Sequence, residues 1–74
     1  MMPMQYLVIV EKSENGFGAY VPDLPGCVAA GETRKETLSL IQEAIEFHIE
    51  GLKRSGESIP IPKSQSELVD VHAA

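Results

Sequence analysis

The chain has little of what small proteins use to reinforce a core. Its 74 residues include one cysteine, two histidines and no tryptophan. An internal disulfide is therefore excluded, and few side chains remain for a metal cage. A domain of this size buries only about 60 % of the surface that its unfolded chain exposes. Because disulfides and metals offer no reinforcement, we expect the chain to form homo-oligomers.

Basic residues are also scarce. Six Lys and Arg residues stand against eleven Asp and Glu residues, which gives a formal net charge of −5 at pH 7. Affinity for nucleic acids comes mainly from Lys and Arg contacts with phosphates, so we expect no direct nucleic-acid binding. An acidic chain is better suited to a basic partner.

Long apolar runs are missing as well. The longest one covers residues 6–10, which is far too short to span a bilayer, and no basic residue precedes it as in a secretory signal. We therefore expect no membrane association. An unpaired Cys27 suits a reducing compartment, and this predicts a cytoplasmic location.

The residues that are present predict three strands before residue 33. Residues 4–11 carry apolar side chains on both faces, a pattern typical of a central strand. Asn15-Gly16 predicts a hairpin turn, because both residues tolerate positive φ. The returning strand covers residues 17–21. A third strand of small side chains follows over residues 27–32 and indicates that another element packs closely against it.

One long helix is predicted after these strands. Thr33 and Glu36 have the spacing of a capping box, in which Thr33 accepts from the Glu36 amide and the Glu36 side chain reaches back to the Thr33 amide. Ser55-Gly56 marks the end of the helix. The apolar stripe that should face the sheet consists of Leu38, Ile41, Ile45, Ile49 and Leu52.

Two apolar residues of this helix fall outside the stripe. Leu40 and Phe47 lie two turns apart on the opposite side and should be exposed in a monomer. One interpretation is that they only cover a loop or the C-terminal tail. The other is that they form a contact surface for a second copy or a partner.

The C-terminal part begins with a proline-rich stretch and continues with alternating apolar and polar residues. Pro60-Ile61-Pro62 enforces an extended exit from the helix, and residues 67–72 have the alternation of a short edge strand. Twelve residues follow Pro62, and no repeat or second domain is indicated. The prediction is a single domain over residues 1–74, of α+β class and β-β-β-α-β order.

The series of motifs resembles the HicB-like antitoxin family over residues 4–62. The motifs that carry the resemblance are Asn15-Gly16, Gly18-Ala19-Tyr20, residues 22–27, Gly31-Glu32-Thr33, Glu43-Ala44, residues 48–52 and residues 59–62. The resemblance implies a partial ribonuclease H-like fold, a three-stranded antiparallel sheet plus a short C-terminal strand with one helix packed on it. It also implies association into dimers or tetramers.

The resemblance further implies a partner, a small basic toxin of the HicA type that cleaves mRNA and is neutralised by complex formation. Many antitoxins of this family carry a C-terminal DNA-binding domain. The twelve residues after Pro62 are too few for two helices. We therefore expect no C-terminal DNA-binding domain and no direct operator binding.

Catalytic readings find little support in the sequence. Cys27 as a nucleophile requires a nearby base, and only His48 and His72 carry imidazoles. A metal-dependent nuclease requires several converging carboxylates, and Asp23 and Asp70 are the only aspartates. We expect no enzyme activity, catalytic residue, cofactor or metal, while a nuclease and an orphan oligomeric binding module remain the alternatives. The candidate partner or oligomer contacts are Tyr20, Asp23, Leu24, Leu40 and Phe47.

Overall fold

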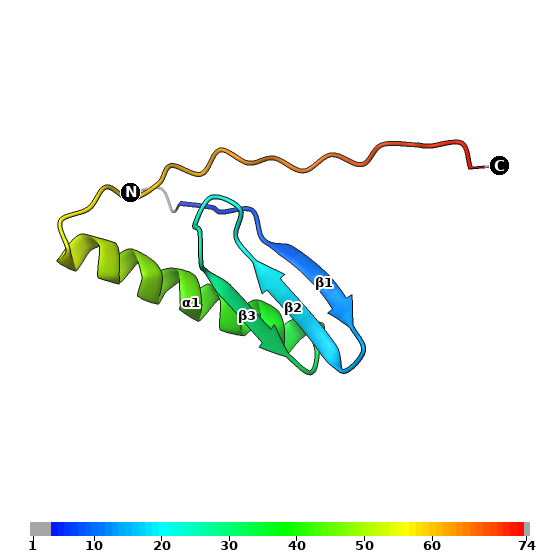
Figure 1. The fold of residues 1–74 in the computed structure, drawn as a ribbon, viewed down its shortest axis with the longest axis horizontal. Helices are drawn as coiled ribbons and strands as arrows, with labels where there is room; N and C mark the ends of the chain where they lie inside the picture. Colours follow the sequence, from blue (N-terminus) through cyan, green and yellow to red (C-terminus); the bar gives the residue numbers. More distant parts are fainter. Residues whose placement is uncertain (1–3, 74) are drawn as a thin grey trace.

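The three expected strands and the helix all form in the computed structural model, which describes residues 4–73 (Figure 1). The elements are β1 (Ile9–Ser13), β2 (Gly16–Tyr20), β3 (Val28–Gly31) and α1 (Arg34–Arg54). Over the described residues this is an α+β fold of order β-β-β-α, which agrees with the first four elements of the expected β-β-β-α-β order. No helix within residues 4–73 is long and apolar enough to cross a membrane.

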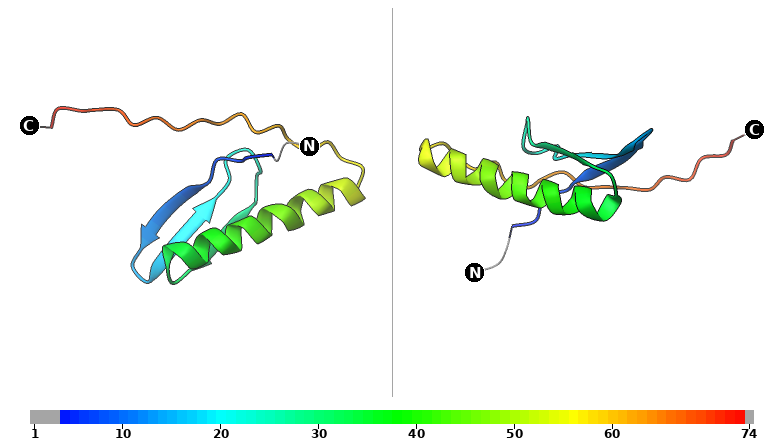
Figure 2. Two further views of the ribbon diagram at one scale, coloured as in Figure 1. Left: turned by 180° about the vertical axis from the view of Figure 1, so that it is seen from behind. Right: turned by 90° about the horizontal axis from the view of Figure 1, so that it is seen from below.

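The strands form one antiparallel sheet in the order β1-β2-β3. Successive side chains of a strand point to opposite faces, and the register aligns Val10, Ala19 and Ala29 across the sheet. These three pack with the core beneath α1. The helix covers that face only, so the molecule has two layers and the other face of the sheet is open (Figure 2).

The β1–β2 hairpin differs in detail from the expected turn. Its two central residues are Glu14 and Asn15, and Asn15 does not have a positive φ. Gly16 already pairs with Ser13 as the first residue of β2. A Cβ atom on Gly16 would lie 2.3 Å from the carbonyl oxygen of Gly31. The glycine is therefore required by a close backbone approach.

The start of α1 confirms half of the predicted capping box. Thr33 is the N-cap, and its hydroxyl oxygen accepts from the Glu36 amide at 3.0 Å. The Glu36 carboxylate accepts from the amide of Glu32, also at 3.0 Å, and not from Thr33 as expected. Gly31 permits this path, because a Cβ atom there would meet Glu36 Oε1 at 2.8 Å.

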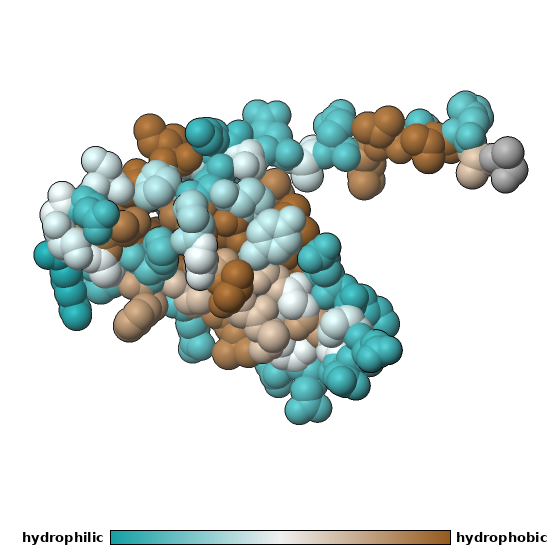
Figure 3. All heavy atoms as spheres, in the orientation of Figure 1, coloured by the Kyte–Doolittle hydropathy of each residue, from teal (hydrophilic) through white to brown (hydrophobic). Residues whose placement is uncertain are grey.

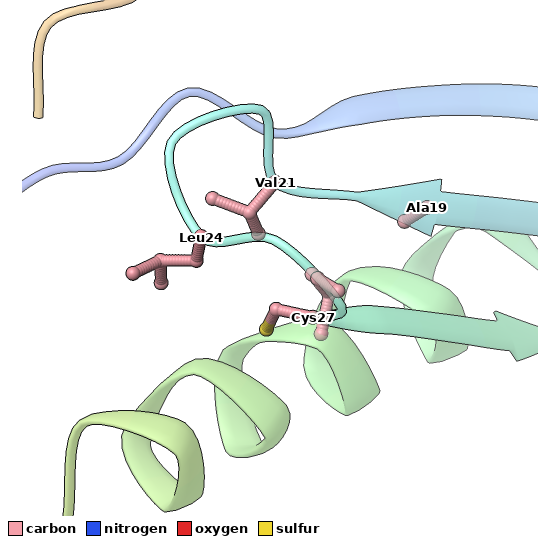
Figure 4. Close-up of a cluster of buried hydrophobic side chains, with 5 residues drawn as sticks. Ala19, Val21, Leu24 and Cys27 are labelled. Carbon is pink, nitrogen blue, oxygen red and sulfur yellow. The ribbon is translucent and has the colours of Figure 1, made fainter. Parts of the chain in front are cut away.

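The core is small and centres on the β2–β3 connection. Figure 4 shows Ala19 on β2 with Val21, Leu24 and Cys27 on the connection above α1. These four residues and Ile41 are the buried apolar residues of the core. The predicted helix stripe is confirmed at Ile41, which is 2 % exposed. Its remaining members are half-buried: Leu38, Ile45, Ile49 and Leu52.

Thr37 is a buried residue of the helix that the sequence pattern does not identify. It is fully buried, and its hydroxyl donates to the Thr33 carbonyl at 2.8 Å and lies 3.4 Å from the Phe17 carbonyl. The apolar stripe does not include it, because threonine is counted as polar. Satisfied hydroxyls of this kind are compatible with a core position.

Two expected strands are corrected by the structure. The first strand begins at Ile9 and not at residue 4, because residues 4–8 are extended but have no ladder partner. The short C-terminal strand over residues 67–72 does not form. These residues are extended and exposed, since an edge strand requires a neighbouring strand and the tail runs past the sheet (Figure 1).

Truncation of Ile41 tests the small core. We expect Ile41→Ala to lower the free energy of unfolding by about 2–5 kcal/mol, because the substitution leaves a cavity that the surroundings fill only in part. Urea denaturation at one fixed protein concentration measures the change. Glu43→Ala is the control, since an exposed substitution on the same helix should stay within about 0.5 kcal/mol of the wild type. Equal values for the two variants would contradict this description of the core.

Candidate interaction surfaces

The β2–β3 connection is a closed loop that belongs to the core. The Val21 amide donates to the Cys27 carbonyl, the Leu24 amide to the Val21 carbonyl and the Cys27 amide to the Leu24 carbonyl, at 3.0–3.2 Å. Leu24 is 0 % exposed. Leu24 is one of the expected partner contacts, and in the folded chain its side chain fills the core and offers no exposed surface.

Cys27 behaves as a small apolar residue. Its side chain is buried among core residues, and burial raises the pKa of its thiol. A protonated thiol is a poor nucleophile. Within the described residues 4–73, no group of three or more His, Cys, Asp or Glu side chains is placed to hold a metal ion.

Asp23 in the same loop holds the chain segment that follows the helix. Its Oδ2 accepts from the amides of Lys63 and Ser64, both at 2.9 Å, and its Oδ1 accepts from the Ser64 hydroxyl at 2.7 Å. These hydrogen bonds, with the Lys63 charge, lower the pKa of the Asp23 carboxyl against the opposing effect of burial. We call this arrangement the Asp23 clamp. Because the chain itself occupies the carboxylate, Asp23 is 9 % exposed and is not a free contact for a partner.

A second contact joins the same segments. The Tyr6 hydroxyl donates to the carbonyl of Pro60, and burial, followed by the charge of Asp23, raises the pKa of Tyr6. The proline-rich segment is thus tied both to the residues before β1 and to the β2–β3 connection. Sequence reasoning missed the clamp, because Asp23 and Ser64 are 41 positions apart and no local spacing relates them.

The open face of the sheet carries Tyr20. The register places Tyr20 between Ile9 and Val28 in one cross-strand row, and Tyr20 and Val28 are 42 % and 65 % exposed. The next row contains Gly18 and Ala30. Seen from this side, apolar colours cover the middle of the strands (Figure 3).

The outer face of α1 carries Leu40 and Phe47. They are 38 % and 83 % exposed, as expected from their position opposite the core stripe. Helical spacing places Glu43 between them, Glu36 one turn before Leu40 and Glu50 one turn after Phe47, and all three glutamates are exposed. The five residues form a stripe of alternating acidic and apolar side chains, which we call the acidic helix face.

The Asp23 clamp predicts a pH-dependent attachment of the tail. Since the folded pKa of Asp23 is lowered, its stabilising effect is complete above the unfolded value of about 4 and is lost as the pH falls through the folded value. We expect Asp23→Asn to speed hydrogen exchange at the Lys63 and Ser64 amides at neutral pH, with a shrinking difference from the wild type in acid. NMR measures both rates.

The second aspartate provides the control for this experiment. Asp70 is exposed in the tail, so Asp70→Asn should leave the exchange of the Lys63 and Ser64 amides unchanged. Equal exchange in the wild type and Asp23→Asn at neutral pH would mean that the clamp does not hold the tail in solution.

Comparison with known proteins identifies the group to which the chain is related. A family model described as the HicB-like antitoxin of bacterial toxin-antitoxin systems matches residues 6–73. A UPF0150 protein of Thermoplasma acidophilum is 46 % identical over 71 residues, which are 95 % of this chain and 100 % of that protein. Antitoxin HicB 2 of Photorhabdus laumondii is 32 % identical over 96 % of this chain, and the match spans 52 % of that antitoxin.

A solved structure agrees with the sequence relatives. A chain of a HicA3 and HicB3 toxin-antitoxin complex superposes with a TM-score of 0.69 at 37 % identity, over 80 % of this chain and 70 % of that chain. The likeness thus extends from sequence to the sheet and helix described above. On the match to residues 6–73 and these relatives, the chain belongs to the HicB-like antitoxin family.

Proposed function

We propose that this chain is an antitoxin that binds and neutralises a small basic toxin of the HicA type by forming a complex with it. The observation that carries the proposal is its similarity to a chain of a HicA3 and HicB3 toxin-antitoxin complex. The net charge of −5 supports a basic partner, since opposite charges favour encounter and register. Neutralisation by binding requires no catalytic group in the antitoxin.

We propose the acidic helix face as the surface that contacts the toxin. Leu40 and Phe47 supply exposed apolar area, and the glutamates between and beside them match a basic surface. Apolar anchors within a charged rim are the usual anatomy of a specific interface. The open sheet face around Tyr20 has apolar area as well, but Glu11 is the one acidic residue among its rows within β1–β3.

An antitoxin of this kind should have a neighbouring reading frame that encodes a short basic protein, and co-expression of the two proteins tests the function. We expect the chain to restore growth that the basic protein arrests, and the two proteins to co-purify as a complex that weakens with added salt, because exposed ionic contacts are screened. Growth arrest that persists although the chain is expressed and soluble would contradict an antitoxin role. In that case an orphan oligomeric binding module becomes the better description.

Substitutions on the helix test the surface. We expect the double variant Leu40→Glu, Phe47→Glu to lose rescue and co-purification, because both apolar anchors are replaced by charges. The double variant Ser39→Glu, Gln42→Glu is the matched control, since it adds the same charge at exposed positions of the same helix outside the acidic helix face. Circular dichroism verifies that both variants are folded.

A third variant separates the two apolar surfaces. Tyr20→Ser alters the open sheet face and should leave rescue intact. Loss of rescue in Tyr20→Ser together with full rescue by Leu40→Glu, Phe47→Glu would place the toxin on the sheet and refute the assignment to the helix.

A further inference from the structure

The C-terminal tail, residues 65–73, extends away from the body of the molecule and packs against no other described segment of the chain. All of its residues are exposed, and Leu68, Val69 and Val71 are 102 %, 74 % and 81 % exposed. The tail is extended and continues beyond the sheet in every view (Figures 1 and 2). Three large apolar side chains in water are a cost to a chain whose core is small, so the tail has the composition of a strand that lacks its sheet.

The segment before the tail holds it in this direction. Pro60 and Pro62 restrict the backbone to extended conformations, and proline-rich linkers act as semi-rigid spacers. The contact of Tyr6 with Pro60 and the Asp23 clamp then fix this spacer on the body up to Ser64. From Ser64 onward the chain points away from α1 and past the sheet (Figure 1).

The β1 edge of the sheet, in contrast, lacks a neighbouring strand among the described residues. Residues 6–10 are apolar on both faces, which is typical of a central strand. In the structure, however, β1 is an edge strand with β2 on one side only, and residues 4–8 before it are extended without a ladder partner. The edge is apolar up to Val10, and Glu11 and Lys12 place charges only on its second half. An apolar edge offers its unpaired backbone groups to another strand.

The tail lacks a sheet and the β1 edge lacks a strand, so the two features are complementary. Each copy of the chain carries both. We propose that the tail of one copy adds as a fourth strand to the β1 edge of a second copy, which returns its own tail in the same way. Because the exchange is reciprocal, it closes with two-fold symmetry and leaves no unused tail or β1 edge on either copy. It makes β1 a central strand, and the alternation of side chains puts Val69 and Val71 on one face of the extended sheet and Leu68 on the other. This inference does not depend on the antitoxin function.

The solution mass and a proline substitution test the exchange. We expect the wild type to have twice the 8.1 kDa mass of one chain by light scattering, and Val69→Pro to have the mass of a monomer, because proline removes a ladder donor and disrupts strand pairing. Val69→Thr is the matched control. It keeps the amide and the β-branched shape and should remain a dimer.

Hydrogen exchange locates the edge that receives the tail. We expect the β1 amides that point away from β2 to be protected in the wild type and to exchange rapidly in Val69→Pro, while the amides that bond to β2 keep their protection. A monomeric wild type, a Val69→Pro variant that stays dimeric, or outward β1 amides that exchange equally in both proteins would overturn the proposal. Rescue of growth from the toxin is measured separately with Val69→Pro, so that failure of the strand exchange and failure of the antitoxin function can be told apart.

Discussion

The fold depends on a three-stranded sheet that packs against a helix on one face only. Over the described residues, α1 packs against Val10, Ala19 and Ala29. On the opposite face, Tyr20 and Val28 are exposed and Ile9 beside them is half-buried. A core of this size gives limited stability by itself. Both of the proposed interaction surfaces follow from this geometry, since the chain has apolar surface left over on the helix and at the β1 edge.

The β2–β3 connection and its Asp23 carboxylate organise the remainder of the chain. Leu24 and Cys27 turn inward to complete the core, and Asp23 turns to the proline-rich segment and fixes Lys63 and Ser64. A short loop with two prolines therefore both completes the core and attaches the segment that follows the helix. Cys27, considered in the sequence as a possible nucleophile, is part of the core in the structure. The proposed contact residues lie on α1 and in the tail.

Local sequence patterns predicted the features that depend on residues close together in the chain. The helix bounds follow from the cap at Thr33 and the stop at Ser55, and the exposure of Phe47 follows from helical periodicity. Contacts between distant segments were not predictable in this way. The burial of Leu24 depends on how the β2–β3 connection packs on α1. The Asp23 clamp and the absence of a ladder for residues 67–72 depend on how the proline-rich segment crosses the body, and no local spacing encodes either arrangement.

The central claim is that binding by this chain silences a basic toxin, and inhibition of the purified toxin tests it most directly. The proposed partner is a basic toxin of the HicA type that is expected to cleave mRNA, so RNA cleavage by such a purified toxin is the quantity to measure while the chain is added. Our account predicts that cleavage falls in proportion to the added chain and stops at a fixed stoichiometry. Cleavage that continues at its full rate in a large molar excess of folded chain would contradict the account.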